Sequence, residues 1–272
     1  MNRSWRSLLP WMTVFAVAMA FLESAVVVDL RALYYPKGFT FPLAPIDRRI
    51  ALTELVRELA TMVMLLAPGA LLSRSGSERF AWFVYCFGVW DIFYYVFLKV
   101  VLDWPATWFD PDILFLVPVP WVGPVLAPVL VSVGMIGLGI FMLHAREKGQ
   151  ASPLQRREWL LLSLSAVTML YTFIEEPLRH VLLHSGQVLS VAASGEGLGQ
   201  LRDYVPGHFL WSVFSGGCLI GLTGLVIAMR RTAHARVAAE IRRGTGTSLK
   251  PGGRNHVERL RLKDGNTLEN GR

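Results

Sequence analysis

Residues 122–143 read VGPVLAPVLVSVGMIGLGIFML, a run with no Asp, Glu, Lys, Arg or His. About 20 apolar residues in a helix cross the hydrocarbon core of a bilayer. The run is long enough for that, so it predicts a transmembrane helix. Three glycines within it, Gly134, Gly137 and Gly139, would allow a second helix to approach closely in lipid.

Five further apolar runs lie at residues 8–30, 50–72, 80–101, 159–178 and 205–229. The first begins like a signal peptide but stays apolar past Ala25, which favours a retained helix. Of all residues 53% are hydrophobic and 17% are charged, whereas a soluble domain usually has about 25% charged residues. We therefore predict an all-α fold, a polytopic membrane helix bundle of about six transmembrane helices within residues 1–229.

The segment just before residues 122–143 has a different character. It is apolar from Ile113 to Trp121 but contains Pro118 and Pro120, and Pro124 follows. Proline lacks the N–H group that a helix interior needs, so a regular helix is disfavoured here. Non-helical backbone at membrane depth is tolerated only where protein or water surrounds it. We predict a short re-entrant or interfacial segment before the fourth helix.

The formal net charge of +7 belongs to the C-terminal tail. Residues 230–272 hold eleven Lys or Arg against four Asp or Glu, which accounts for the whole excess. The tail has too few apolar residues for a core, so it should be largely disordered. Anionic lipid headgroups are its expected partner, since they attract each nearby basic residue by about 1 kcal/mol. The rest of the chain is formally neutral, and no nucleic-acid partner is expected.

Basic residues also predict the orientation, because cytoplasmic loops are enriched in Lys and Arg. Residues 102–121 contain three aspartates and no Lys or Arg, as expected of a periplasmic stretch. One loop departs from the rule, since its basic residues would lie outside. The overall count still predicts an inner (plasma) membrane protein with both termini in the cytoplasm. The basic residues of the dissenting loop are Arg31, Lys37, Arg48 and Arg49.

Ionisable residues recur within the predicted spans, although a charge at the bilayer centre costs roughly 2.5–3.5 kcal/mol on insertion scales. In the predicted orientation they all lie in the outward half of their helices. We expect the bundle to turn them inward, into an acid-rich pocket that is open to the periplasm. With two aromatic neighbours, the candidate pocket residues are Glu23, Glu54, Arg57, Glu58, Trp90, Asp91, Tyr95, Lys99, Glu175, Glu176, His180 and His208.

Spacing and charge support a shared site. Glu54 and Glu58 are four residues apart, as are Glu176 and His180, so each pair shares one side of a helix. The carboxylates of the set outnumber its Lys and Arg side chains, even with Arg179 included. Buried carboxylates without a partner take up protons or bind a cation. The working hypothesis is therefore proton- or cation-linked binding or transport in this pocket.

Two alternatives remain open. The first is an intramembrane metal-dependent enzyme, because carboxylate and imidazole ligands suit divalent transition metals. Its candidate ligands are Glu54, Glu58, Glu176, His180 and His208, and a narrower version has haem held by His208 with His180 or His184. The second is an accessory subunit that binds other membrane proteins. Its charges would serve only helix packing, with Arg57 paired to Glu54 or Glu58 and Lys99 paired to Asp91.

Glu175-Glu176-Pro177-Leu178-Arg179, followed later by His208, resembles in part the Glu-Glu-x-x-x-Arg and downstream histidine motifs of CAAX-type intramembrane proteases. The arginine lies one position too early, and Tyr204 stands where the histidine motif has phenylalanine. The resemblance covers about five residues, and it assigns no catalytic role to them.

Overall fold

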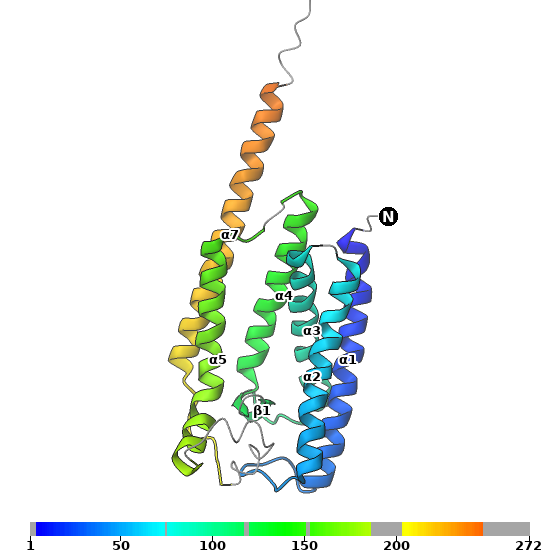
Figure 1. Ribbon diagram of the computed structural model, residues 1–272, viewed down its shortest axis with the longest axis vertical. Coiled ribbons are helices and arrows are strands. Elements are labelled where there is room, and N and C mark those ends of the chain that lie inside the picture. The colour runs from blue at the N-terminus through cyan, green and yellow to red at the C-terminus, as the bar shows by residue number, and fades with distance from the viewer. Residues whose placement is uncertain (1–3, 74, 117–119, 151–152, 186–202, 247–272) are drawn as a thin grey trace, which may run out of the picture. The chain divides into compact units, whose positions relative to one another are not determined.

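The computed structural model describes residues 4–73, 75–116, 120–150, 153–185 and 203–246 (Figure 1). This part of the chain is mostly helical and has six helices that are long and apolar enough to cross a membrane. The predicted helix bundle with about six long apolar helices is thus confirmed. In chain order they are α1 (Trp5–Tyr34), α2 (Arg48–Leu72), α3 (Gly76–Leu102), α4 (Leu126–Glu147), α5 (Arg156–Ser185) and α7 (Trp211–Gly246).

Several helix ends differ from the predicted spans. Pro177 lies inside α5 without ending it, and the helix continues to Ser185. The last helix begins at Trp211 rather than at residue 205, because Pro206 and Gly207 precede it in an irregular segment. Two compact units, Met1–Met229 and Arg230–Arg272, divide within α7. Residues 230–246 are helical, and residues 247–272 lie outside the described part, so a disordered tail there stays a prediction.

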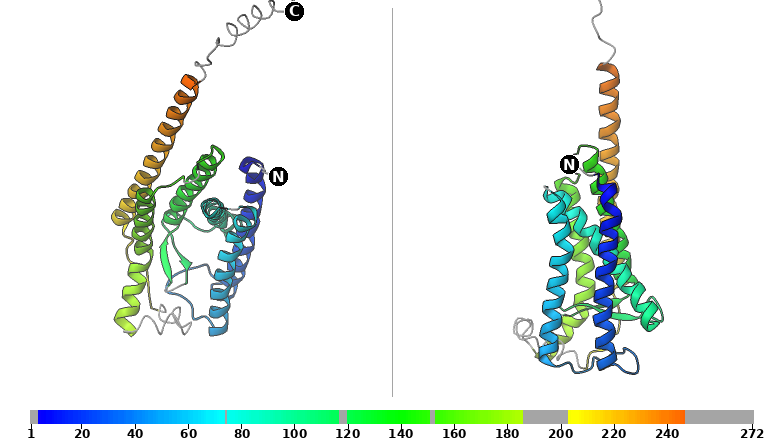
Figure 2. Two further views of the ribbon diagram at one scale, coloured as in Figure 1. Left: turned by 45° about the horizontal axis from the view of Figure 1, so that its top comes forward. Right: turned by 90° about the vertical axis from the view of Figure 1, so that its right-hand side faces the viewer.

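Between α3 and α4 the chain forms a β-hairpin, which an all-α assignment omits. Strand β1 (Pro111–Phe115) pairs antiparallel with β2 (Trp121–Pro124), so that Asp112 lies opposite Gly123. The turn around Pro118 is outside the described residues. Figure 2 shows the strands between α5 on one side and α1 and α2 on the other. The described part of the Pro-rich segment is extended, and its depth in a membrane stays a prediction.

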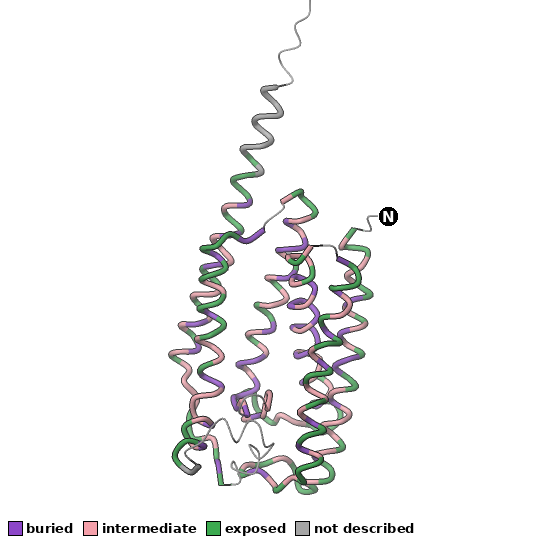
Figure 3. Tube along the Cα trace, viewed as in Figure 1, coloured by how far each residue is buried: buried purple, intermediate pink, exposed green. Residues whose placement is uncertain are grey.

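Helix α3 is the centre of the bundle formed by the first four helices. It packs against α1, α2 and α4, and half of its most apolar window is buried, compared with 17% of that of α2. Trp82, Cys86 and Leu98 are fully buried along it. Figure 3 shows that buried residues concentrate on α3 and the facing side of α4. In the sequence α3 is one apolar span among six, whereas in the structure it is the helix against which α1, α2 and α4 pack.

Close backbone contact joins α3 to α4. A Cβ atom added to Gly139 of α4 would lie 2.8 Å from the Ala81 carbonyl oxygen of α3. The same addition at Gly88 of α3 would come within 2.6 Å of the Ser132 carbonyl oxygen. Gly134 and Gly137, which were expected to serve the same purpose, have nothing within 4 Å of such an atom. Only Gly139 of the three therefore mediates close approach within the described structure.

The C-terminal end of α4 is hydrogen-bonded to the N-terminal end of α1. Glu147 accepts hydrogen bonds from the Ser4 hydroxyl at 2.6 Å and from the Trp5 indole N–H at 2.8 Å. Arg6 adds an ion pair at 3.6 Å. We call these contacts the Glu147 clamp.

The α3–α4 contact leads to a test of the fold. We expect Gly139→Ala to destabilise the protein by about 1–3 kcal/mol, the usual cost of forcing an extra methyl group into a tight contact. Gly137→Ala, two residues away on the same helix, should leave stability unchanged or raise it slightly. Thermal unfolding of the detergent-purified protein measures both, and equal effects of the two substitutions would contradict the packing.

Candidate functional site

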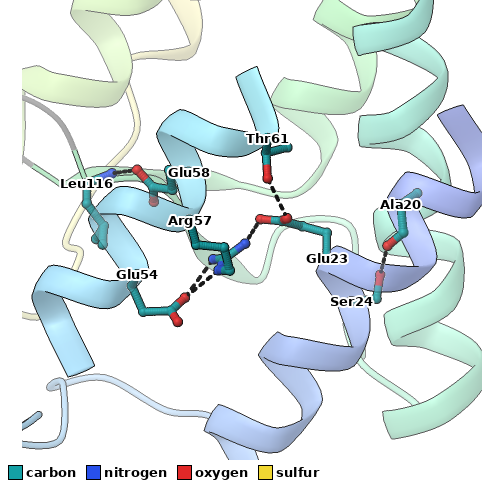
Figure 4. A network of polar contacts seen from close by, with 8 residues as sticks. All are labelled: Ala20, Glu23, Ser24, Glu54, Arg57, Glu58, Thr61 and Leu116. Carbon is teal, nitrogen blue, oxygen red and sulfur yellow. Dashed lines mark hydrogen bonds and ion pairs between the residues drawn. The ribbon is translucent and has the colours of Figure 1, made fainter. Parts of the chain in front are cut away.

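Arg57 lies at the centre of a polar network between α1 and α2 (Figure 4). Its guanidinium forms an ion pair with Glu23 of α1 and another, at 2.7 Å, with Glu54 one turn earlier on α2. The Thr61 hydroxyl donates a second hydrogen bond to Glu23 at 3.0 Å. The Glu23 and Glu54 side chains are only 11% and 10% exposed. The expected pairing of Arg57 with Glu54 is present, and Glu23 is an additional partner.

Glu58 connects α2 to the hairpin. Its carboxylate accepts a hydrogen bond at 3.1 Å from the backbone N–H of Leu116, the residue after β1 (Figure 4). Arg57 is the charged group of opposite sign close to it, although that guanidinium bonds to the other two acids. Glu58 is therefore held by a backbone donor rather than by a dedicated ion pair.

Asp91 on α3 is buried and accepts a hydrogen bond at 2.8 Å from the Ser132 hydroxyl of α4. The expected Asp91–Lys99 pair is wrong. Lys99 instead binds Asp103, with 2.8 Å between Nζ and Oδ1, and also donates to the carbonyl oxygens that follow α3. Asp91 and Lys99 are two helical turns apart, about 12 Å along the axis, whereas Asp103 ends the helix one turn beyond Lys99.

A buried ion pair between Arg31 and Asp112 was missed by the sequence analysis, which treated both residues as parts of outer loops. Their side chains lie 3.0 Å apart and are 8% and 3% exposed. The Arg31 guanidinium also stacks on Trp104, 3.8 Å from the ring centroid. One signal was available: Arg31 follows Ser24 by seven residues, on the buried stripe of α1.

Asp112 is buried, with 2% of its surface exposed. Burial raises the pKa of its carboxyl above the ordinary value, and the Arg31 guanidinium opposes that shift. The Tyr95 hydroxyl lies beside this carboxylate, while Trp90 packs among aromatic rings of α3. The Asp112 carboxylate acts electrostatically on Asp91 of α3. The Arg31–Asp112 ion pair therefore lies near the acidic residues of the helices.

These residues form one group between α1, α2, α3 and β1, which we call the acidic cluster. It contains five carboxylates and two guanidinium groups, an excess of three formal negative charges. Arg57 compensates two acids, Glu23 and Glu54, whereas Arg31 compensates Asp112. Lys99 contributes nothing to this balance because Asp103 holds it. The members of the acidic cluster are Glu23, Arg31, Glu54, Arg57, Glu58, Asp91 and Asp112.

The candidates from α5 lie on the other side of the hairpin, around a pocket with a volume of about 200 Å³. Glu176 accepts hydrogen bonds of 2.9 Å from the Tyr204 hydroxyl and from the Gly207 N–H. His208 Nδ1 lies 3.6 Å from the same carboxylate. Burial and the nearby carboxylate raise the pKa of Tyr204. We call this site the Glu176 pocket.

Two other α5 candidates, Glu175 and His180, are not among the residues that line this pocket. Glu175 forms an ion pair with Arg179 at 3.6 Å, and the His180 ring packs 5.4 Å from that of Tyr204. The predicted single site is thus divided into two by the hairpin. Glu54 and Glu58 belong to the acidic cluster, and Glu176 and His208 belong to the Glu176 pocket.

The candidate metal ligands are divided in the same way. Across the described ranges, no group of three His, Cys, Asp or Glu side chains is placed to hold a metal ion. The side chain of His184, one of the haem candidates, lies outside the described residues. His208 faces Glu176 and His180 faces Tyr204, so the two rings have separate partners.

Comparison of the chain with protein-family models, with curated proteins and with solved structures finds no match in any of the three. Function is therefore inferred from the geometry of the acidic cluster and of the Glu176 pocket.

The Arg31–Asp112 pair leads to a stability test with a pH dependence. Arg31→Met leaves a buried carboxylate without its cation, which should lower the free energy of unfolding by about 3–5 kcal/mol at neutral pH. Because burial holds the pKa of Asp112 above its value in the unfolded chain, the folded protein binds that proton more tightly. The penalty should therefore shrink as the pH falls and return as the pH rises through the raised pKa.

Thermal unfolding between pH 4 and pH 8 measures this effect. The double variant Arg31→Met/Asp112→Leu is the matched control, since replacing both charges with apolar groups should recover most of the stability at every pH. A penalty that is independent of pH, or a double variant as unstable as the single one, would contradict the assignment.

Proposed function

We propose that the chain is a multi-pass protein of the inner (plasma) membrane. The six apolar helices support this, as do large apolar side chains on their outer surfaces. On α2, Val56, Leu59 and Val63 are 66%, 65% and 59% exposed, on the side away from the core. A row of this kind is unfavourable in water and favourable against lipid.

In the proposed orientation both termini are cytoplasmic and the hairpin faces the periplasm. Support comes from the distribution of Lys and Arg in the loops. The C-terminal end of α1, the N-terminal end of α2 and the hairpin lie at one end of the bundle, so the acidic cluster and the Glu176 pocket would share the periplasmic half (Figure 1). The basic residues after Met229 would then meet the anionic lipid headgroups of the cytoplasmic leaflet.

We infer that the acidic cluster binds protons or a cation and exchanges them with the periplasmic side. The observation that carries this proposal is the charge imbalance, five buried or half-buried carboxylates around two guanidinium groups. In a low-dielectric interior such an excess of negative charge must be balanced by bound protons or a positive ion. Glu58 and Asp91 are the acids best suited to this role, because backbone and hydroxyl donors hold them in place of guanidinium groups.

The two alternatives have less support. A metal-dependent enzyme needs its ligands to converge, whereas Glu58 contacts the residue after β1, and Glu176 and His208 line the pocket beside β2. An accessory subunit with a pure packing network needs the carboxylates to be neutralised by fixed charges. Arg31 and Arg57 supply two positive charges for five acids, so that network is incomplete.

The orientation has a direct test in intact cells. In a background of Cys86→Ser and Cys218→Ser, a cysteine introduced by Ala106→Cys should react with a membrane-impermeant maleimide. One introduced by Lys148→Cys should react only after the cells are opened. Both positions are exposed in the structure, so a difference in labelling reports the side of the membrane. The reverse labelling pattern would contradict the proposed orientation.

The charge balance has a second test. We expect the detergent-purified protein, in weak buffer with a pH indicator, to release protons when Na⁺, Mg²⁺, Ca²⁺, Mn²⁺ or Zn²⁺ is added, because an incoming cation displaces protons from the carboxylates. If the cluster handles protons alone, proteoliposomes should instead show proton flux down an imposed pH gradient. Glu58→Gln and Asp91→Asn should each remove most of the signal.

Asp103→Asn is the matched control, because this carboxylate is 93% exposed and lies outside the cluster. It should leave the release or the flux unchanged. If neither proton release nor flux is observed, and Glu58→Gln lowers only the unfolding temperature, the cluster serves packing and the proposed function is wrong.

A further inference from the structure

The Glu176 pocket has a lining unlike that of the acidic cluster. Aromatic rings and prolines make up much of its wall, and Glu176 is its one carboxylate among the described lining residues. None of these residues is Lys or Arg, and His208 is the other titratable group. Arg179, the nearest cation on α5, forms an ion pair with Glu175. The pocket thus offers a carboxylate that faces no Lys or Arg of the described lining, and the His208 ring, 3.6 Å away, is its one basic neighbour there.

Hydrogen bonds fix the position of that charge. The Gly207 N–H and the Tyr204 hydroxyl each donate to a different oxygen of Glu176. Each carboxylate oxygen can accept more than one hydrogen bond, so both retain acceptor capacity toward a ligand. The side chain is 18% exposed, which leaves it accessible from the pocket while shielding it from bulk water. An ion pair formed there would be stronger than one on an open surface.

Three aromatic rings complete the site. Trp211, the first residue of α7, packs edge-on against Phe109, with 5.9 Å between ring centroids, and against Phe209 at 4.9 Å. All three line the pocket with Glu176. Aromatic faces attract cations, and tryptophan does so most strongly. A carboxylate beside such faces is the arrangement that recognises substituted ammonium groups.

We propose that the Glu176 pocket binds a substituted ammonium group, with Glu176 as its counter-ion and Trp211 as the principal aromatic face. A volume of about 200 Å³ accommodates a head of the size of choline or ethanolamine but no acyl chain. Such a group can come from a free amine in the periplasm or from a zwitterionic phospholipid at the membrane surface. This site is separate from the acidic cluster and does not depend on the function proposed for it.

The test uses choline and ethanolamine as probes, with the full-length protein in a sugar-headed detergent that carries no competing ammonium group. Ligand-observed NMR gives the affinities. Glu176→Gln should weaken choline binding by about tenfold or more, which corresponds to about 1.4 kcal/mol. Trp211→Leu should weaken it by about 2- to 5-fold, as expected for one cation–π contact, while leaving the Glu176 hydrogen bonds in place.

Two matched controls accompany these variants. Glu175→Gln removes the neighbouring carboxylate of α5, which does not line the pocket, and should leave choline affinity unchanged. The neutral isostere 3,3-dimethylbutan-1-ol has the shape of choline without its charge and should not bind measurably. Equal binding of choline and the isostere, equal effects of Glu175→Gln and Glu176→Gln, or no binding of either amine and no retained lipid would overturn the proposal.

A second arm identifies the source of the ammonium group. Protein is recovered from nanodiscs of phosphatidylglycerol with or without phosphatidylethanolamine, and native mass spectrometry detects retained lipid. Retention of phosphatidylethanolamine by the wild type and by Glu58→Gln, but not by Glu176→Gln, assigns the pocket to a lipid headgroup. Binding of the free amines without lipid retention assigns it to a soluble ligand. Because Glu58→Gln disrupts only the acidic cluster, this site and the proton or cation function fail or succeed separately.

Discussion

Two arginines hold together the polar interior of the first four helices. Arg57 joins α1 to α2 through Glu23 and Glu54, and Arg31 joins α1 to the hairpin through Asp112. A charged side chain cannot be buried alone without a penalty of several kcal/mol, so each of these pairs requires its partners to stay in place. The position of the hairpin against α1 therefore follows from electrostatics as much as from apolar packing. The same pairs bring the remaining carboxylates near one another.

The hairpin borders both the acidic cluster and the Glu176 pocket, which differ in chemistry. On the β1 side, Asp112 pairs with Arg31 of α1, and the Leu116 N–H donates to Glu58 of α2. On the other side, Gly123 leaves room for the Phe173 ring, which a Cβ atom would approach to 2.6 Å. Gly123 and Val122 line the Glu176 pocket there. A segment of fewer than fifteen residues thus separates a buried, acid-rich cluster from a small aromatic pocket that is open at the surface.

The sequence predicted the helices well because long apolar runs have few alternatives, but it could not place side chains across a hairpin that it did not predict. The expectation that all outward ionisable residues share one site does not foresee the hairpin: Glu58 contacts the residue after β1, whereas Glu176 lines a pocket together with residues of β2. Helical spacing places Asp91 and Lys99 on one side of α3, but a shared side is not a contact. The two residues are two turns apart, and Asp103 at the helix end is only one turn from Lys99. Arg31 and Asp112 were overlooked because their burial depends on contacts distant in sequence, 81 residues apart. Arg57 and Glu54, by contrast, are three residues apart on one helix, so their spacing in the sequence is enough to predict the pair.

The Glu147 clamp has a mechanical consequence for α1. This helix is tied at its first turn to the end of α4 and near its last turn to β1 through Arg31. Sliding α1 along its axis would break the contacts at one of its ends, so these contacts oppose such a displacement. Of the first four helices, α2 is the least restrained by packing, because only 17% of its apolar window is buried. The Arg57–Glu23 ion pair is the polar contact that joins this least buried helix to α1.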